Sequence, residues 1–170
     1  MAAEPGDDTI REQLDALLDD SDQPMAVVTA RSNDGRIAGC LVGFSSQCGI
    51  EPPRYAVWLS VKNHTYEVAR DSAHLVVHLL DPGQLALAEH FGSLTGHEID
   101  KFADRPWSAG PGGVPVLAEA SAWFAGPAEH HPPVGDHALF VITPEAVGGR
   151  LNGRPLSYQA VRDVAPGNPA

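Results

Sequence analysis

The fold is decided by residues 24–48, which read PMAVVTARSNDGRIAGCLVGFSSQC. The apolar and β-branched run at 25–31 predicts a strand, and the Asn33-Asp34-Gly35 sequence after it is a strong hairpin turn signal. A second run, at 37–48, predicts one long strand whose two glycines mark points where it bends or bulges. Because a hairpin turn joins the first two strands, the sequence favours an antiparallel sheet over a doubly wound parallel one.

The rest of the chain predicts short strands alternating with short helices. Strands are expected at 54–61, 74–80, 117–129, 137–147 and 155–158, and helices at 9–20, 63–72 and 82–91, with a short helical piece at 97–102. The stretch 92–113 is rich in Gly and Pro, and a connection this long in a compact domain usually serves function or covers a site. Six or so mostly antiparallel strands with inserted helices predict a mainly β fold, a β-barrel with helical decoration.

Composition and charge exclude several classes of protein. The 170 residues are 43% hydrophobic and 19% charged, which predicts one domain that is neither disordered nor embedded in a membrane. The net charge is −11, and −7 of it lies in residues 1–22, where eight acidic residues face Arg11 alone. An acidic surface repels phosphate backbones, so we expect no nucleic-acid partner. The acidic N-terminus is unlike a signal peptide, and we expect a soluble, cytoplasmic protein with no membrane partner.

The cysteines and histidines predict neither a disulfide nor a metal site. Cys40 and Cys48 lie in one predicted strand, where a straight backbone holds them too far apart to be bridged, so free thiols in a reducing compartment are expected. His130 and His131 are adjacent, and adjacent side chains on a strand point to opposite faces. Motifs of the HxH or HExxH type are absent from the sequence, and we therefore expect no metal ion.

The best candidate for a phosphate site is Lys62-Asn63-His64-Thr65, at the start of the helix predicted for 63–72. A helix N-terminus offers free backbone N–H groups and the positive end of the helix dipole, and Lys62 adds a full positive charge. The alternative is a simple N-cap beside a solvated lysine.

An ordered set of short motifs resembles the short-chain flavin reductases, which are FMN-binding split β-barrels. The motifs are 24–29, Asp34-Gly35, Pro52-Pro53, Asn63-His64-Thr65, 74–80, 87–91, Lys101-Phe102, 113–117, Trp123 and Gly135-Asp136-His137. They imply a flavin reductase-like domain at residues 23–158, between an acidic extension at 1–22 and a C-terminal tail at 159–170.

The resemblance implies an oxidoreductase that uses NADH or NADPH to reduce FMN (or FAD), as a homodimer with the flavin at the dimer interface. Often such a protein supplies reduced flavin to a separate monooxygenase. The implied flavin contacts are Leu41, Val42, Gly43, Phe44, Ser45, Ser46, Gln47, Cys48, Gly49, Lys62, Asn63, His64, Thr65, Lys101 and Phe102, and the implied nicotinamide contacts are Asp136 and His137. Because the cofactors carry the hydride transfer, no protein acid or base is obligatory.

This sequence departs from the family in the stretch that contacts flavin. Where the family has Thr-Ala-Asn-Ser and then Ser-x-Ser, the chain has Leu41-Val42-Gly43-Phe44 and Gln47-Cys48-Gly49. Backbone N–H donors do not depend on side chains, so a pocket built on them survives this change. The loss of hydroxyls leaves an alternative function, a split-barrel protein that binds flavin, deazaflavin or haem with little reductase activity. A small metal hydrolase ranks last.

Overall fold

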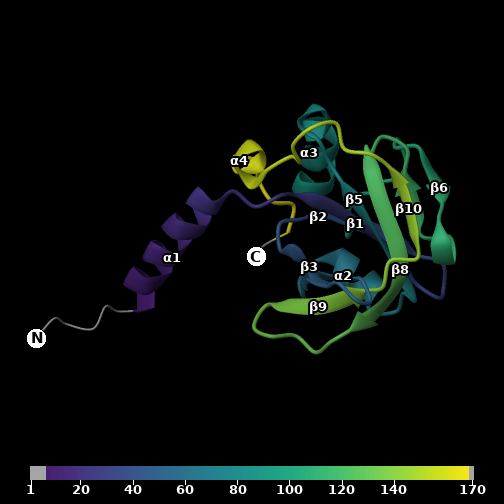
Figure 1. The fold of residues 1–170 in the computed structure, drawn as a ribbon, viewed down its shortest axis with the longest axis horizontal. Coiled ribbons are helices and arrows are strands. Elements are labelled where there is room, and N and C mark those ends of the chain that lie inside the picture. The colour runs from purple at the N-terminus through teal and green to yellow at the C-terminus, as the bar shows by residue number, and fades with distance from the viewer. Residues whose placement is uncertain (1–6, 169–170) are drawn as a thin grey trace, which may run out of the picture.

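A computed structural model of the protein describes residues 7–168, and Figure 1 shows a curved sheet with short helices at its margins. The strands are β1 (Ala26–Arg31), β2 (Ile37–Val42), β3 (Ser45–Gly49), β4 (Arg54–Ser60), β5 (His74–Leu79), β6 (Trp107–Ala109), β7 (Pro115–Leu117), β8 (Ala122–His130), β9 (His137–Ile142) and β10 (Ala146–Gly149). The α-helices are α1 (Asp7–Ser21), α2 (His64–Ala69), α3 (Leu85–Ser93) and α4 (Tyr158–Val161), and the 3₁₀ turns are η1 (Pro82–Gln84) and η2 (Pro111–Gly113).

The main sheet has eight strands in the order β2-β1-β5-β8-β9-β4-β3, with β10 paired to β8, and its pairings are antiparallel. β2 and β3 stand at opposite ends of this order, although only two residues separate them in the chain. The sheet must therefore curl until its two ends meet, which is the geometry of an open, split barrel. The mainly β, antiparallel fold expected from the sequence is confirmed.

Both faces of strand β1 are buried, because its residues alternate between two apolar clusters. Ala26, Val28 and Ala30 point into the barrel, where they pack with β4 and β9 residues such as Phe140. Val27 points the other way, into an outer cluster that it forms with α3 and with the C-terminal segment. The barrel interior and the helical layer are thus joined through one fully buried strand.

The hairpin that begins the sheet forms as predicted. Ser32 N–H donates to the carbonyl oxygen of Arg36 at 2.9 Å, and Gly35 adopts a φ of +92°, which an L residue with a side chain rarely adopts. Cross-strand pairing then runs from Arg31 opposite Ile37 to Ala26 opposite Val42.

Three strands that were predicted as continuous are each divided into two. The run 37–48 is two strands, since the chain turns at residues 43–44 and leaves β1 for the far end of the sheet. The run 117–129 is likewise β7 and β8, with a turn closed by Ala120 N–H on the carbonyl of Leu117. The run 137–147 is β9 and β10, which pair with two different parts of β8. At each break the chain moves to a new place of pairing: β3 pairs with β4, β8 with β5, and β10 with the opposite end of β8.

The C-terminal region is more ordered than the sequence predicts. Residues 155–158 form no strand beyond a single bridge between Pro24 and Ser157, and α4 covers the last residue of that expected strand and the start of the tail expected at 159–170. The reason is burial, because Leu156 and Val161 insert into the outer apolar cluster. The helical piece expected at 97–102 is also wrong, since that segment consists of hydrogen-bonded turns.

The N-terminal helix is confirmed, but it stands away from the barrel (Figure 1). Its apolar stripe of Ile10, Leu14, Leu17 and Leu18 is between 49% and 69% exposed. The chain just beyond the helix is tied down, where Gln159 N–H donates to Asp22 Oδ1 at 2.9 Å. Residues 1–6 of the acidic extension lie outside the described residues. Within 7–168, helices are too short or too polar to cross a bilayer.

Candidate functional site

A cleft of about 240 Å³ opens between β2 and β4, close to the point where the chain turns into β3. Its lining is Met25, residues 40–44 and 58–60, Asn63, His137 and Tyr158. Most of these side chains are apolar, and a few polar groups converge among them, which is the usual make-up of a small-molecule site. Five of the predicted flavin contacts (Leu41, Val42, Gly43, Phe44 and Asn63) therefore meet the predicted nicotinamide contact His137 in one place.

The lip of this cleft is shaped by the turn at Gly43 and Phe44. A Cβ atom on Gly43 would lie 3.3 Å from Sδ of Met25, so the glycine allows the backbone to pass close to that side chain. Phe44 is 59% exposed, and its ring centroid lies 5.0 Å from that of His137. The two rings form the lip from two distant parts of the sequence.

The β4–β9 ladder brings the Lys62–Thr65 segment close to the Asp136-His137 pair. Ser60 pairs with His137 at the end of the ladder, and Val61 N–H donates to the carbonyl of Asp136 at 2.9 Å. Asn63 then caps α2, its side-chain oxygen accepting from Thr65 N–H at 2.9 Å. As a result, residues 60–63 lie beside residues 136–137, more than 70 positions away in the chain.

Asp136 orients the His137 imidazole. Nδ1–H of His137 donates to Asp136 Oδ1 at 2.6 Å, which leaves Nε2 as the ring nitrogen available to a ligand. This hydrogen bond and the charge of His137 hold the pKa of Asp136 below its ordinary value, and the positive charge of Lys62 contributes in the same direction. Lys62 is thus electrostatically coupled to the pair that the resemblance assigns to nicotinamide.

A second cleft, of about 370 Å³, lies beyond the first turn of α2 and is lined by His64, His97, Lys101 and Phe102 among others. The Lys101 ammonium is buried and donates to the carbonyls of Gly39 at 3.0 Å and of Phe91 at 2.9 Å. Burial lowers the pKa of this lysine. Through these two hydrogen bonds Lys101 links β2, which forms a wall of the first cleft, to α3.

The structure does not gather all the predicted flavin contacts. Residues 45–49 belong to β3 and lie outside the lining of either cleft, as do Lys62 and Thr65. Thr65 is buried, and its N–H is already taken by the Asn63 cap. Lys62 is exposed beside the Asp136-His137 pair, close to the first cleft.

Several lining residues were missed by the sequence analysis. Met25, Cys40, Trp58, Leu59, Ser60 and Tyr158 line the first cleft. Met25, Cys40 and Leu59 are buried and read in the sequence as ordinary strand residues. Nothing in the local sequence of Tyr158 could have placed it beside β2, since it arrives there from the far end of the chain.

Known proteins similar to this chain include flavin reductases and an FMN-binding protein. The family model described as flavin reductase like domain matches residues 19–165. An NADH:FMN oxidoreductase of Rhodococcus erythropolis is 30% identical over 118 residues, which cover 69% of this chain and 59% of that protein. The reductase component of the 4-hydroxyphenylacetate 3-monooxygenase of Salmonella typhimurium is 25% identical over 135 residues, 78% of each chain.

Among solved structures, an FMN-binding protein from Thermus thermophilus superposes with a TM-score of 0.70 at 30% identity. The match covers 79% of this chain and 77% of that one. The chain spans 59% and 62% of the lengths of two of the curated relatives that it matches.

Proposed function

The chain belongs to the flavin reductase-like domain family, and on that premise we propose that it is an NAD(P)H-dependent flavin reductase that binds FMN in the cleft between β2 and β4. The observation that carries the proposal is the convergence of residues 41–44, Asn63 and His137 on one cleft. Its apolar walls suit a flat aromatic ring system, and its few polar groups suit the ring edge and the ribityl chain.

In this proposal, the residues of the chain hold the flavin and orient the nicotinamide toward it. Flavin, when bound, supplies the hydride-accepting ring, so the protein needs no acid–base pair of its own. Leu41, Val42 and Phe44 exclude water from the cleft, while His137, held by Asp136, offers Nε2–H or its lone pair to the carboxamide of a nicotinamide. Lys62 supplies the positive charge for a flavin phosphate beside the cleft.

The His137 role is tested by His137→Ala. Flavin affinity should be retained while KM for NAD(P)H rises and kcat changes little, because binding shared by the ground and transition states is lost. Asp136→Asn should give a milder form of the same defect, and His131→Ala, in the same loop, serves as the control. Release of flavin by His137→Ala, with unchanged turnover per bound flavin, would refute the assignment.

The Lys62 role is tested with two ligands that differ only in the phosphate. Lys62→Ala should weaken FMN binding by about 1–3 kcal/mol, the range of a charge-assisted hydrogen bond, and should hardly affect riboflavin. Arg70→Ala, at the other end of α2, is the matched control. Equal losses for FMN and riboflavin would show that Lys62 supports the fold and not the phosphate.

A homodimer is part of the proposal, because one chain leaves the cleft incomplete. Phe44 is exposed at the lip, and the apolar face of α1 is uncovered on a 15-residue helix, a length that is marginally stable on its own. A second copy that covers both would bury the roughly 2,000 Å² or more that obligate dimers bury. The reduced flavin would pass from such a dimer to a separate monooxygenase, and the free thiols of Cys40 and Cys48 agree with the cytoplasm.

The dimer is tested by sedimentation of the full chain. The double variant Leu14→Asp/Leu17→Asp should sediment as a monomer, whereas Glu12→Ala, on the opposite face of α1, should not change the oligomeric state. A wild-type monomer that still binds flavin tightly would contradict the proposal. A chain that starts at Gln23 lacks α1 and should therefore sediment as a monomer, as the double variant does.

The apolar residues Leu41 and Phe44 favour a second candidate, a cofactor-binding protein with little reductase activity. They stand where the family has Thr and Ser, and they leave the cleft wall with few side-chain donors. The absorption spectrum after incubation with FMN, followed by an NADH oxidation assay, separates the candidates. Flavin bands without NADH consumption favour the second, and flavin bands with it favour the first.

A further inference from the structure

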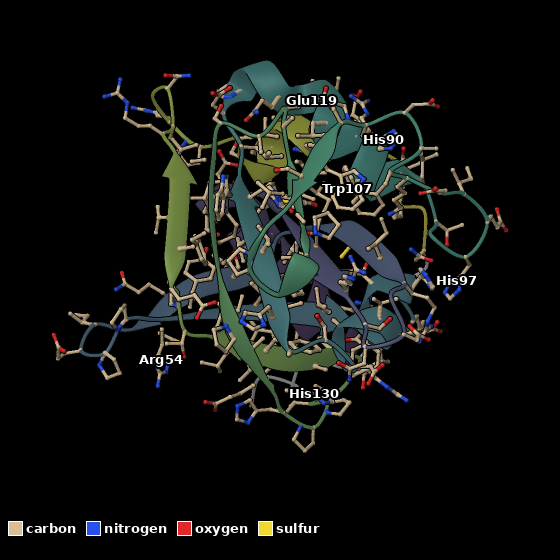
Figure 2. All side chains as sticks on the ribbon, turned by 90° about the vertical axis from the view of Figure 1, so that its right-hand side faces the viewer. Arg54, His90, His97, Trp107, Glu119 and His130 are labelled. Atoms are coloured by element: carbon tan, nitrogen blue, oxygen red, sulfur yellow. The ribbon has the colours of Figure 1, made fainter. Side chains whose placement is uncertain are left out.

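His64, Glu67 and His97 form a cluster outside the flavin cleft. Glu67 lies between the two imidazoles, with Oε2 at 3.3 Å from Nδ1 of His64 and Oε1 at 3.9 Å from Nε2 of His97. The imidazole centroids are 4.8 Å apart, and one ligand atom from each residue lies within 4.8 Å of the other two. Figure 2 shows His97 at the edge of the molecule, well away from His130.

Local structure holds the three side chains together. His64 and Glu67 are spaced i, i+3 on α2, so they share one face of the helix. The loop that carries His97 is closed by Glu98 N–H and Ile99 N–H, which both donate to the carbonyl of Thr95. Thr95 is itself anchored, since its hydroxyl donates to Asn168 Oδ1 at 2.8 Å.

Gly96 lets this loop lie directly on His64. A Cβ atom at position 96 would come within 2.8 Å of Cδ2 of His64, closer than real contacts allow. The glycine therefore brings His97 to the neighbourhood of α2. A surface ion pair between Glu67 and one histidine would not require the second imidazole or this close approach.

Two imidazoles and one carboxylate are a ligand set that Zn²⁺ takes in sites with an open position, as His₂Glu centres do. With bond lengths of about 2.0–2.2 Å, tetrahedral geometry separates ligand atoms by roughly 3.4 Å. The distances of 3.3 and 3.9 Å run from the two imidazoles to different oxygens of Glu67, and one ligand atom from each residue lies within 4.8 Å of the other two. Side-chain movements of roughly 1–1.5 Å would therefore bring the three ligand atoms to tetrahedral separation. The net charge of −11 also favours a cation over an anion.

We propose that His64, Glu67 and His97 bind one Zn²⁺ ion, with its fourth position open to the second cleft. The ion ties the loop at 94–100 to α2 and so stabilises the wall that carries Lys101. His64 takes part through its imidazole, whereas a flavin phosphate would use its backbone N–H, and the metal site is independent of the proposed reductase activity. The chain spacing of 64, 67 and 97 matches no metal motif, which explains why the sequence predicted none.

The test is Zn²⁺ binding by chelator-treated full-length protein, measured by competition with a chromophoric chelator and by elemental analysis. The wild type should bind one equivalent. His97→Gln and Glu67→Gln should each weaken binding at least about tenfold, because even the loss of an outer-shell partner costs 10–100-fold. His131→Gln, an exposed histidine on another edge, should bind as the wild type does.

Two further measurements distinguish a specific Zn²⁺ site from nonspecific binding of the ion to the surface. Co²⁺ should give the intense visible bands of a tetrahedral site in the wild type and lose them in His97→Gln. Zn²⁺ should raise the melting temperature of the wild type but not of Glu67→Gln, because the ion binds only the folded site. The proposal would be overturned if the folded wild type did not bind Zn²⁺ stoichiometrically. It would also be overturned if His97→Gln and Glu67→Gln both bound Zn²⁺ as tightly as the wild type does.

Discussion

In β2, the side chains of Ala38, Cys40 and Val42 are at most 4% exposed, whereas in β3 those of Ser46, Gln47 and Cys48 face solvent. Two residues separate the strands. β2 pairs with β1 and packs at Gly39 against the ring of Phe91. In addition, the carbonyl of Gly39 accepts a hydrogen bond from the ammonium of Lys101. Within residues 7–168, β3 pairs with β4 alone, and the register of this pairing is irregular between Gln47 and Gly49.

The difference teaches how the cleft is built. Its β2 wall is part of the core, so residues there must satisfy packing before they can contact a ligand. β3 has no such constraint, so its side chains are free to vary. Changes in β2 should therefore lower stability first, and changes in β3 should leave stability nearly unchanged.

The largest effect is expected for Gly39→Val. A Cβ atom at this position would lie 2.9 Å from Cε1 of Phe91 and 3.2 Å from Cζ of Phe102, and valine adds two methyl groups to it. Overpacking of this kind should cost about 3 kcal/mol or more of unfolding free energy, measured by urea denaturation. Ser46→Val places the same side chain in β3 and should cost little. Similar losses for the two variants would erase the contrast between the strands.

The next effect is a loss of stability in acid, caused by His78 on β5. Its Nδ1–H donates to the carbonyl of Val27 at 2.9 Å, and its Nε2 accepts from Leu117 N–H at 3.0 Å. Burial lowers the pKa of this imidazole to about 4. The unfolded chain, with an ordinary pKa near 6.5, binds the proton first, so stability is complete above about pH 6.5 and falls as the pH drops toward 4.

This single group should remove about 2–3 kcal/mol between pH 7 and pH 4.5, by denaturation at each pH. His78→Gln should lower stability at pH 7 but flatten the pH dependence, while His131→Gln should leave both unchanged. An unaltered acid slope in His78→Gln would mean that other groups cause the loss.

A smaller effect is expected for Lys101→Met. Methionine keeps the length of the side chain but leaves the carbonyls of Gly39 and Phe91 without this donor. Loss of these buried hydrogen bonds, offset in part by relief of a buried charge, should cost about 1–3 kcal/mol of unfolding free energy. Arg36→Met, at the exposed start of the same region, is the control, and an equal loss there would remove the special role of Lys101.

The smallest effect is expected in β3. Gln47→Ala and Cys48→Ser should change the unfolding free energy by no more than about 0.5 kcal/mol, as exposed substitutions usually do. A flavin titration on the same proteins sharpens the comparison. Unchanged affinity would mean that these side chains make no contact with flavin, whereas a loss of affinity at constant stability would assign a contact to them.

Much of the fold could be predicted because its signals are local. The 33–35 turn, the Asn63 cap and the apolar runs of β1 and β5 each depend on neighbours within a few residues, and each is confirmed. The breaks at 43–44 and 143–145 could not be predicted in the same way. They follow from the curl of the sheet, which depends on pairings between distant strands.

The candidate site divides along the same line. By itself, the sequence determined the antiparallel class, the ordered motifs of the family and the residues 41–44, Asn63 and His137 that meet in the cleft. Only the tertiary structure decided that Trp58 and Tyr158 join them, that Lys101 is buried behind the wall, and that Gly96 brings His97 to Glu67. The physical reason is that side-chain type and local spacing are written in neighbouring residues, whereas proximity across 30 to 130 positions exists only after β4, β9 and the C-terminal segment have packed.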